Sequence, residues 1–274
     1  MIIVKNLSFG YKKDLSILNN INFKILPGQW VSIIGDNGSG KSTLAKILAG
    51  LLQIQKGKIF INNFELKEEN LSLLRACMGI IFQNPDYQFV GFDVRSDIAF
   101  GLENQRLSRQ RMQQIITKIS QELNIYDLLD KKPQDLSGGQ KQKVAIASVL
   151  AMNPEIIILD EPTSFLDPQG VKEINDIVKK IHKEKKKILI TITHDLEFAL
   201  QSDEIIFLNR GCLLKHDMPK NFIKDYLFLQ KYFVKLPLSL KIYYAMEQEK
   251  NLNIIKLEIL QQIQDILWQY SLKM

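Results

Sequence analysis

The sequence predicts an α/β domain with a parallel sheet at its core, additional antiparallel strands and a helical insertion. Alternating apolar and polar residues near the start predict antiparallel strands in "IIVKNLSFGY" and "NINFKI". A short apolar strand, "WVSIIG", runs into a glycine-rich turn and a helical pattern. Continuous apolar runs separated by helical segments are typical of parallel strands covered on both faces. The chain has such runs in "EIIILD", "KILITITH" and "DEIIFLNRG".

The remaining elements follow from the same patterns. A further alternating run, "GKIFINNFEL", adds antiparallel structure, and the polar-rich stretch from Ser108 to Leu129 is helical in pattern. After about Lys215 the sequence becomes mostly helical and amphipathic. We therefore expect a main domain over residues 1–220, with a helical subdomain at about 84–150, followed by a C-terminal helical extension over 221–274.

Composition is that of a globular protein with a sizeable core, because 46% of the 274 residues are hydrophobic and 24% are charged. The net charge of +6 suits nucleotide phosphates, nucleic acid or an anionic membrane surface, although the lysines are spread along the chain. No apolar stretch approaches the ~20 residues that cross a bilayer, and "MIIVKNLSF" does not have the pattern of a signal peptide. We therefore expect a soluble chain, unless another component holds it to a membrane.

A phosphate-binding loop is predicted in "GDNGSGKST", which follows a strand and opens a helix. Glycines allow the backbone N–H groups to converge on a phosphate, and the helix N-terminus adds its positive dipole end. A lysine supplies a charge to the β- and γ-phosphates, and the next hydroxyl can bind Mg²⁺. The predicted nucleotide-binding residues are Gly35, Asp36, Asn37, Gly38, Ser39, Gly40, Lys41, Ser42 and Thr43.

An acidic strand end in "EIIILDEP" complements this loop. Asp160 is predicted to hold Mg²⁺, and Glu161 to act as the general base on the attacking water. His194 closes the next apolar strand and is predicted to orient that water near the γ-phosphate. Gln83, at the end of "IIFQ", carries an amide that can reach both Mg²⁺ and the water. Two solvated acids at a strand end are the ordinary alternative, but the phosphate loop makes the catalytic interpretation stronger.

A second glycine pair, in "LSGGQKQKVAIA", stands directly before a helical pattern. In their order along the chain, the phosphate loop, the Gln83 loop, "LSGGQ", the acidic strand, "SFLD" and His194 resemble the ATP-binding cassette (ABC) family over roughly residues 3–220. This resemblance implies a P-loop ATPase with a RecA-like parallel core and a helical signature subdomain. It also implies that two cassettes stack head to tail. The signature of one, Ser137, Gly138, Gly139 and Gln140, then contacts the γ-phosphate held by the other, with a helix starting near Gln140.

The resemblance extends to residues around the nucleotide. Tyr11 matches the aromatic residue that stacks on adenine in this family, and an ordinary strand-end tyrosine is the alternative. Asp167 matches the loop that crosses the interface between cassettes. Phe165 is bulkier than the residue usual in that loop, so the resemblance does not fix the local geometry of the interface. The implied cofactors are ATP and Mg²⁺.

Within the ABC family, "FQNPDYQFVGFDVRSDIAFGLEN" and "YFVKLPLSLKI" are similar to the ATPases of energy-coupling factor (ECF) importers, in the form of the first of two paralogous subunits. This implies import of a vitamin or a transition-metal ion. The implied partners are a second ATPase, more plausibly a paralogue than a copy, a transmembrane coupling protein and a substrate-binding membrane subunit. The chain would be peripheral, at the cytoplasmic side of the cell membrane. Alternatives are the ATPase of another importer class and a soluble regulator acting on nucleic acid, although no nucleic-acid partner is expected.

The region after Gln83, including Asp86, Gln88 and Phe89, would form a groove for helices of the coupling protein. For Phe89 and Phe92, packing in the core is an equal alternative. The amphipathic tail after Asn251 has three interpretations: a dimerisation helix, a helix packed on its own domain, or a membrane-surface helix.

Overall fold

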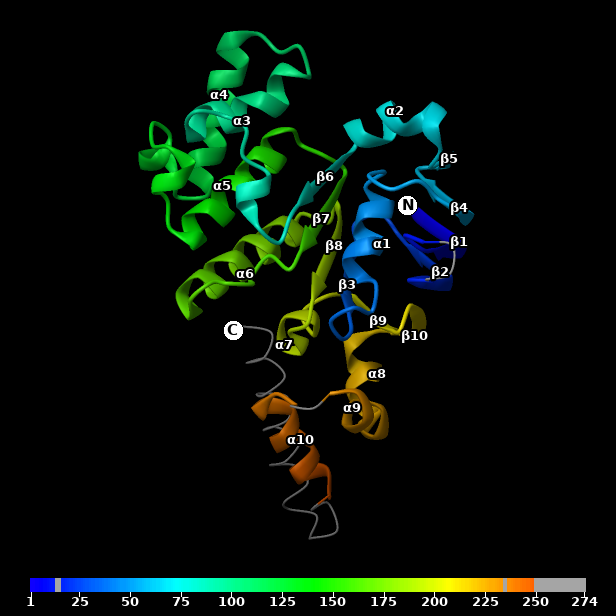
Figure 1. The fold of residues 1–274 in the computed structure, drawn as a ribbon. Helices are drawn as coiled ribbons and strands as arrows, with labels where there is room; N and C mark the ends of the chain where they lie inside the picture. Colours follow the sequence, from blue (N-terminus) through cyan, green and yellow to red (C-terminus); the bar gives the residue numbers. More distant parts are fainter. Residues whose placement is uncertain (13–15, 234–235, 249–274) are drawn as a thin grey trace.

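The computed structural model describes residues 1–12, 16–233 and 236–248, in which two sheets are flanked by helices (Figure 1). The main sheet has six strands in the order β10-β9-β3-β8-β7-β6. Neighbours from β9 to β6 are parallel, and only β10 runs antiparallel at the edge. The predicted α/β class with a parallel core is confirmed. Its strands are β3 Trp30–Ile34, β6 Met78–Ile81, β7 Ile156–Asp160, β8 Ile188–Thr193, β9 Glu204–Asn209 and β10 Cys212–Asp217.

The predicted antiparallel strands form a separate four-stranded sheet in the order β2-β1-β4-β5. Alternate residues of its strands are buried, which explains why the sequence alternates here and not in β3, β7 or β8. Ile2 of β1 pairs with Ile25 on one side and with Ile61 on the other. The strands are β1 Ile2–Phe9, β2 Leu18–Ile25, β4 Lys56–Ile61 and β5 Phe64–Glu65.

Helix α1 (Lys41–Leu48) lies between the two sheets, and one continuous core joins its buried face to both. The other face of the main sheet is covered by a second core, which α6 (Pro168–Lys183) shares with the helical subdomain. That subdomain projects from the sheet on the side of β6 (Figure 1). It contains α3 Val94–Glu103, α4 Arg109–Glu122 and α5 Gly138–Ala151; the short helices α2 Leu71–Ala76 and α7 Leu196–Ala199 lie elsewhere.

The described part of the C-terminal region is helical, as its pattern predicts, but β10 extends to Asp217, so helices begin later than Lys215. They are α8 Pro219–Lys224, α9 Tyr226–Tyr232 and α10 Leu238–Gln248. A third core joins this region to α7 and β9 through Leu196, Phe207, Phe222, Leu240 and Tyr244, among others. The three interpretations of the tail after Asn251 concern residues outside the described ones. Among the helices that are described, none has the length and apolar character needed to cross a membrane.

Candidate functional site

The predicted site residues gather at one edge of the main sheet. Strands β3, β6, β7 and β8 are parallel, so their carboxyl ends lie at the same edge, where ligands bind in open α/β sheets. The phosphate loop follows β3, Gln83 follows β6, Glu161 follows β7 and His194 follows β8. Strand pairing therefore brings together four segments that are far apart in the sequence.

The phosphate loop needs glycine for reasons visible in its own packing. A Cβ on Gly35 would lie 2.0 Å from the carbonyl oxygen of Leu208, and one on Gly40 would lie 2.6 Å from Leu18 Cδ2. Gly38 has φ +79° with open space around it, so only its backbone conformation favours glycine. The side chain of Ser39 is buried, and its hydroxyl has no hydrogen-bond partner among the described residues.

Lys41 lies inside the curl of this loop. Its side chain is 5% exposed, and Nζ donates to the carbonyl oxygens of Gly35 at 2.7 Å and Asp36 at 2.9 Å. Burial lowers the pKa of Lys41, while the nearby carboxylates of Glu161 and Asp160 act in the opposite direction. Because burial disfavours the charged form of Lys41, an anionic ligand beside it would stabilise that form. Together with the cradle at Gly35 and Gly40 and the unpartnered Ser39 hydroxyl, this lysine fits a nucleotide phosphate.

Ser42 and Asp160 face each other across the loop, with Ser42 Oγ donating to Asp160 Oδ1 at 3.1 Å. Asp160 is 5% exposed, and burial raises its pKa, partly offset by the hydrogen bond from Ser42. Mg²⁺ prefers one or two carboxylates completed by hydroxyl, water and phosphate oxygens. The pair fits that donor set. Within the described residues no cluster of His, Cys, Asp and Glu forms a cage by itself.

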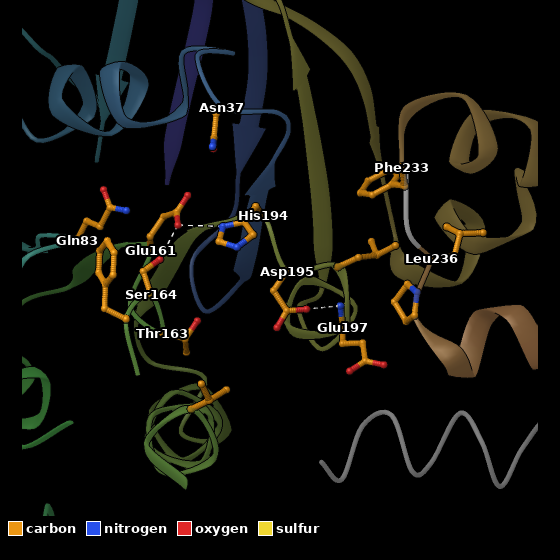
Figure 2. Close-up of a pocket in the computed structure, with 14 residues that line it drawn as sticks. Asn37, Gln83, Glu161, Thr163, Ser164, His194, Asp195, Glu197, Phe233 and Leu236 are labelled. Carbon is orange, nitrogen blue, oxygen red and sulfur yellow. Dashed lines mark hydrogen bonds and ion pairs between the residues drawn. The ribbon is translucent and has the colours of Figure 1, made fainter. Parts of the chain in front are cut away.

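Glu161 and His194 are in direct contact, with His194 Nδ1 at 3.0 Å from Glu161 Oε2 (Figure 2). They line a cavity of about 790 Å³ together with Gln83, whose side chain is exposed, and Asn37 of the phosphate loop. Glu161 has φ +47°, an uncommon conformation for a residue with a side chain. This cavity brings the base, the histidine, the amide and the loop together.

Two parts of the cavity escaped the sequence analysis. Ser164 Oγ donates to Glu161 Oε2 at 2.6 Å, and the position of this serine three residues after the glutamate, in a turn, was the available signal. The opposite wall comes from the C-terminal region, through Phe233, Leu236 and Pro237 (Figure 2). No local pattern indicates that wall, because it depends on how α8 to α10 pack against α7.

Tyr11 stands apart from the cavity, at the edge of the antiparallel sheet. Its ring is 55% exposed and packs edge-on against Phe9 with centroids 5.1 Å apart. Its hydroxyl lies 3.4 Å from Thr43 Oγ1, at the start of α1. The ring is therefore more than half exposed, in the part of the chain that the structure describes, and lies beside Thr43 of the phosphate loop. This arrangement is compatible with stacking on a base, and the predicted role stays a prediction.

The signature segment, Leu136–Gln140, opens α5 two residues earlier than predicted. Ser137 is the N-cap, and its hydroxyl accepts the N–H of Gln140 while Gln140 Oε1 accepts the N–H of Ser137. This reciprocal capping box explains the earlier start, because it stabilises a helix that begins at Gly138. Ser137 and Gly138 are exposed. None of the described residues lining the Glu161 cavity belongs to this segment.

Asp167 is also an N-cap, accepting the N–H of Gly170 at 2.8 Å at the start of α6. Phe165, two residues before it, is 88% exposed and has φ +65°. A bulky side chain in this backbone region is strained, and here it also points away from the core. The structure therefore gives Asp167 a role within the chain, as a helix cap, and places the exposed Phe165 in the lining of the Glu161 cavity.

The residues of the predicted groove after Gln83 differ in how exposed they are. Phe89 packs against the core of the helical subdomain, whereas Phe92 is 74% exposed, with Lys132 Nζ 4.9 Å from its ring centroid. Asp86 is paired with Lys141 at 2.7 Å. Gln88 donates to the carbonyl oxygen of Ala145, and its own amide oxygen is buried without a partner among the described residues.

A phosphate loop, an acidic strand end with a paired histidine, and a separate glycine-opened helix define an ATP-hydrolysing cassette. The ABC transporter family profile matches residues 18–164. The chain is 55% identical, over 274 residues covering 100% of both chains, to the energy-coupling factor transporter ATP-binding protein EcfA of Aster yellows witches'-broom phytoplasma. It is 46% identical over 234 residues, 85% of each chain, to EcfA1 of Mycoplasma pneumoniae. The chain therefore belongs to the ABC transporter family and, within it, to the ECF transporter ATP-binding proteins.

Solved structures agree with this assignment. The chain is similar to cbiO1 from Clostridium perfringens, part of the cbiONQ ABC transporter complex, with a TM-score of 0.76 and 33% identity over 90% of this chain and 98% of that one. It is also similar to the dimeric cassette MJ0796 bound to ADP and Pi, with a TM-score of 0.73 and 29% identity, covering 80% of this chain and 99% of that one. The chain is thus the ATP-binding and ATP-hydrolysing subunit of an ECF-type importer, and a membrane-associated transporter component. Its relatives do not favour another importer class or a soluble regulator acting on nucleic acid.

Proposed function

We propose that this chain hydrolyses ATP between two cassettes and uses the cycle of closure and release to drive uptake of a vitamin or transition-metal ion. The observation that carries this proposal is the contact between Glu161 and His194 at the carboxyl edge of the sheet, beside a loop whose buried Lys41 suits phosphate. The cytoplasmic face of the membrane is the proposed location.

Each residue has a defined part in the reaction. The N–H groups of Gly38 to Thr43 and the ammonium of Lys41 bind the phosphates, and the Tyr11 ring stacks on the base. Ser42 and Asp160, with the amide of Gln83, would hold Mg²⁺, which supplies neutralisation of phosphate charge. Glu161 takes the proton from the attacking water, and His194 orients both the carboxylate and the γ-phosphate oxygen.

The signature segment would serve a partner's nucleotide. Gly138, at the start of α5, is exposed, and Gly138 and Gly139 leave room for close approach to the N-terminus of the helix. Asp167 lies on the segment that meets the second cassette. The proposed partners are a second ATPase subunit, more plausibly a paralogue than a copy, a transmembrane coupling protein and a substrate-binding membrane subunit. The exposed Tyr87, Val90 and Phe92 support a docking role for the region after Gln83.

Glu161→Gln tests this proposal most directly. The variant retains an isosteric side chain but loses the base, so we expect ATP binding to persist, turnover to fall by roughly 1,000-fold and a closed pair of cassettes to accumulate with ATP. Nucleotide binding, phosphate release and size-exclusion chromatography with light scattering measure the three effects. Lys41→Ala is the contrasting variant, since it should weaken binding itself. Ordinary turnover in the glutamine variant would remove Glu161 from its role.

A further inference from the structure

Two side chains converge on a single oxygen of the Glu161 carboxylate. Ser164 Oγ donates to Oε2 at 2.6 Å, and His194 Nδ1 lies 3.0 Å from the same atom (Figure 2). The Glu161 side chain is 11% exposed, whereas that of His194 is 65% exposed. Oε2 is therefore held from both sides. The other oxygen, Oε1, takes part in neither bond and is the one that can accept a proton from water.

The hydroxyl of Ser164 is not needed to form the turn in which it lies. The N–H of Ser164 donates to the carbonyl oxygen of Glu161 at 3.1 Å, so the backbone closes the turn by itself. Glu161 N–H is also fixed, through a 2.9 Å bond to the carbonyl oxygen of Ile192 on β8. With the backbone held at both residues, the Ser164 hydroxyl has a set position relative to the carboxylate.

We propose that Ser164 is a positioning residue for the catalytic base, holding Glu161 Oε2 so that Oε1 faces the attacking water. This inference rests on the proposed role of Glu161. His194 must turn between the carboxylate and a γ-phosphate oxygen, and its exposed ring is free to do so. Ser164 maintains the carboxylate orientation when His194 moves. No bond forms or breaks at Ser164, since its O–H proton stays on Oγ throughout.

Ser164→Ala and Ser164→Thr together test the inference, assayed in the full-length chain beside the wild type. We expect the alanine variant to lower kcat roughly 10-fold, with KM for ATP unchanged, because a misaligned base slows the chemical step and leaves binding intact. Threonine keeps the hydroxyl and should restore most of the rate. Ser148→Ala is the matched control, since its hydroxyl also donates one hydrogen bond, to the carbonyl oxygen of Val144 at 3.1 Å, and Ser148 does not line the cavity. It should turn over at the wild-type rate.

A double variant adds a readout that a purely structural role would not produce. Because both side chains act through Oε2, Ser164→Ala combined with His194→Ala should lower kcat by less than the product of the single effects. Wild-type kcat in Ser164→Ala, a threonine variant as slow as the alanine variant, or fully multiplicative losses would each overturn the inference. If Glu161→Gln abolishes turnover while Ser164→Ala does not reduce it, this inference fails and the proposed function stands. If Glu161→Gln turns over normally, the proposed base itself fails.

Discussion

The two glycine loops of this chain differ in what makes glycine necessary. A Cβ on Gly35 would lie 2.0 Å from the Leu208 carbonyl oxygen, whereas one on Gly139 would meet nothing nearer than Gly170 Cα at 3.9 Å. Gly138 is similar, with its nearest contacts at 3.8 Å. Packing within the chain therefore demands glycine in the phosphate loop and permits a side chain in the signature segment. Glycine also disfavours helix formation, so its presence in the signature indicates a requirement that lies outside this chain.

The largest expected effect is at Gly35. Gly35→Ala forces β9 away from β3, because the new Cβ would overlap the backbone of Leu208. We expect the free energy of unfolding to fall by about 4 kcal/mol and Tm to fall by roughly 10 °C. Gly38→Ala is the matched control, because it shares a positive φ but has open space, and it should lose only about 1 kcal/mol. Thermal unfolding measures both. Equal losses would mean that backbone conformation, and not close approach, explains the first loop.

The second variant tests the other loop, where stability and activity should move in opposite directions. Gly139→Ala places a better helix former in the first turn of α5, so we expect stability to be unchanged or to rise by about 0.5 kcal/mol. ATP turnover should nevertheless fall roughly 100-fold, because the added methyl blocks the approach of a partner's phosphate.

An exposed position in the same subdomain gives the control for this variant. Gln113→Ala in α4 should alter neither property. Unfolding and phosphate-release assays on one preparation make the comparison. A stable Gly139→Ala chain with full turnover would show that the signature glycines serve no external ligand.

The smallest effect concerns charge in the first loop. Burial raises the pKa of Asp160, so its ionised form is disfavoured in the fold, and Asp160→Asn should stabilise the protein by about 1 kcal/mol at neutral pH. In the wild type, the buried Asp160 carboxylate lowers the free energy of unfolding at pH values above the pKa that it has in the folded state. This effect disappears as pH falls below the ordinary value of 3.8, where the carboxyl is protonated in both states.

Denaturant unfolding from pH 7 to pH 3.5 measures this difference, and the advantage of the asparagine variant should shrink as pH falls. The same substitution should abolish Mg²⁺-dependent turnover. Ser42→Ala provides the contrast, because it removes a partner of Asp160 and leaves the buried charge in place. A stability advantage that does not depend on pH would contradict the electrostatic explanation.

Much of the fold could be predicted because the pattern of apolar residues in each strand indicates whether one or both of its faces are buried. The continuous apolar β7 and β8 are buried at every position, and the alternating β1 and β2 are buried on one face. The order of strands and the separation of the antiparallel strands into a second sheet could not be read in this way. They depend on pairings between distant segments, which leave no local pattern.

The candidate site likewise has residues that could be predicted from the sequence and others that could not. Lys41, Asp160 and Glu161 were predicted from motifs that place them at strand ends, and their neighbours at the sheet edge follow from strand parallelism. The Ser164 bond to Glu161 and the wall formed by Phe233 and Leu236 were missed. The first depends on a side-chain rotamer in a turn, and the second on tertiary packing of the C-terminal helices. The domain boundaries and the partner assignments stay predictions.

The position of β3 in the sheet has a consequence for synthesis of the protein. Trp30–Ile34 pairs with Ile188–Thr193 on one side and with Glu204–Asn209 on the other. Gly35 packs closely against the backbone of Leu208 in the second of these strands. A ribosome-bound chain that has emerged only as far as residue 187 carries the whole Lys41 motif and neither neighbouring strand. At ~5–20 residues per second, many seconds separate translation of the motif from that of its supports. The nascent polypeptide therefore has both strands that support its nucleotide cradle only after residue 209 has been translated.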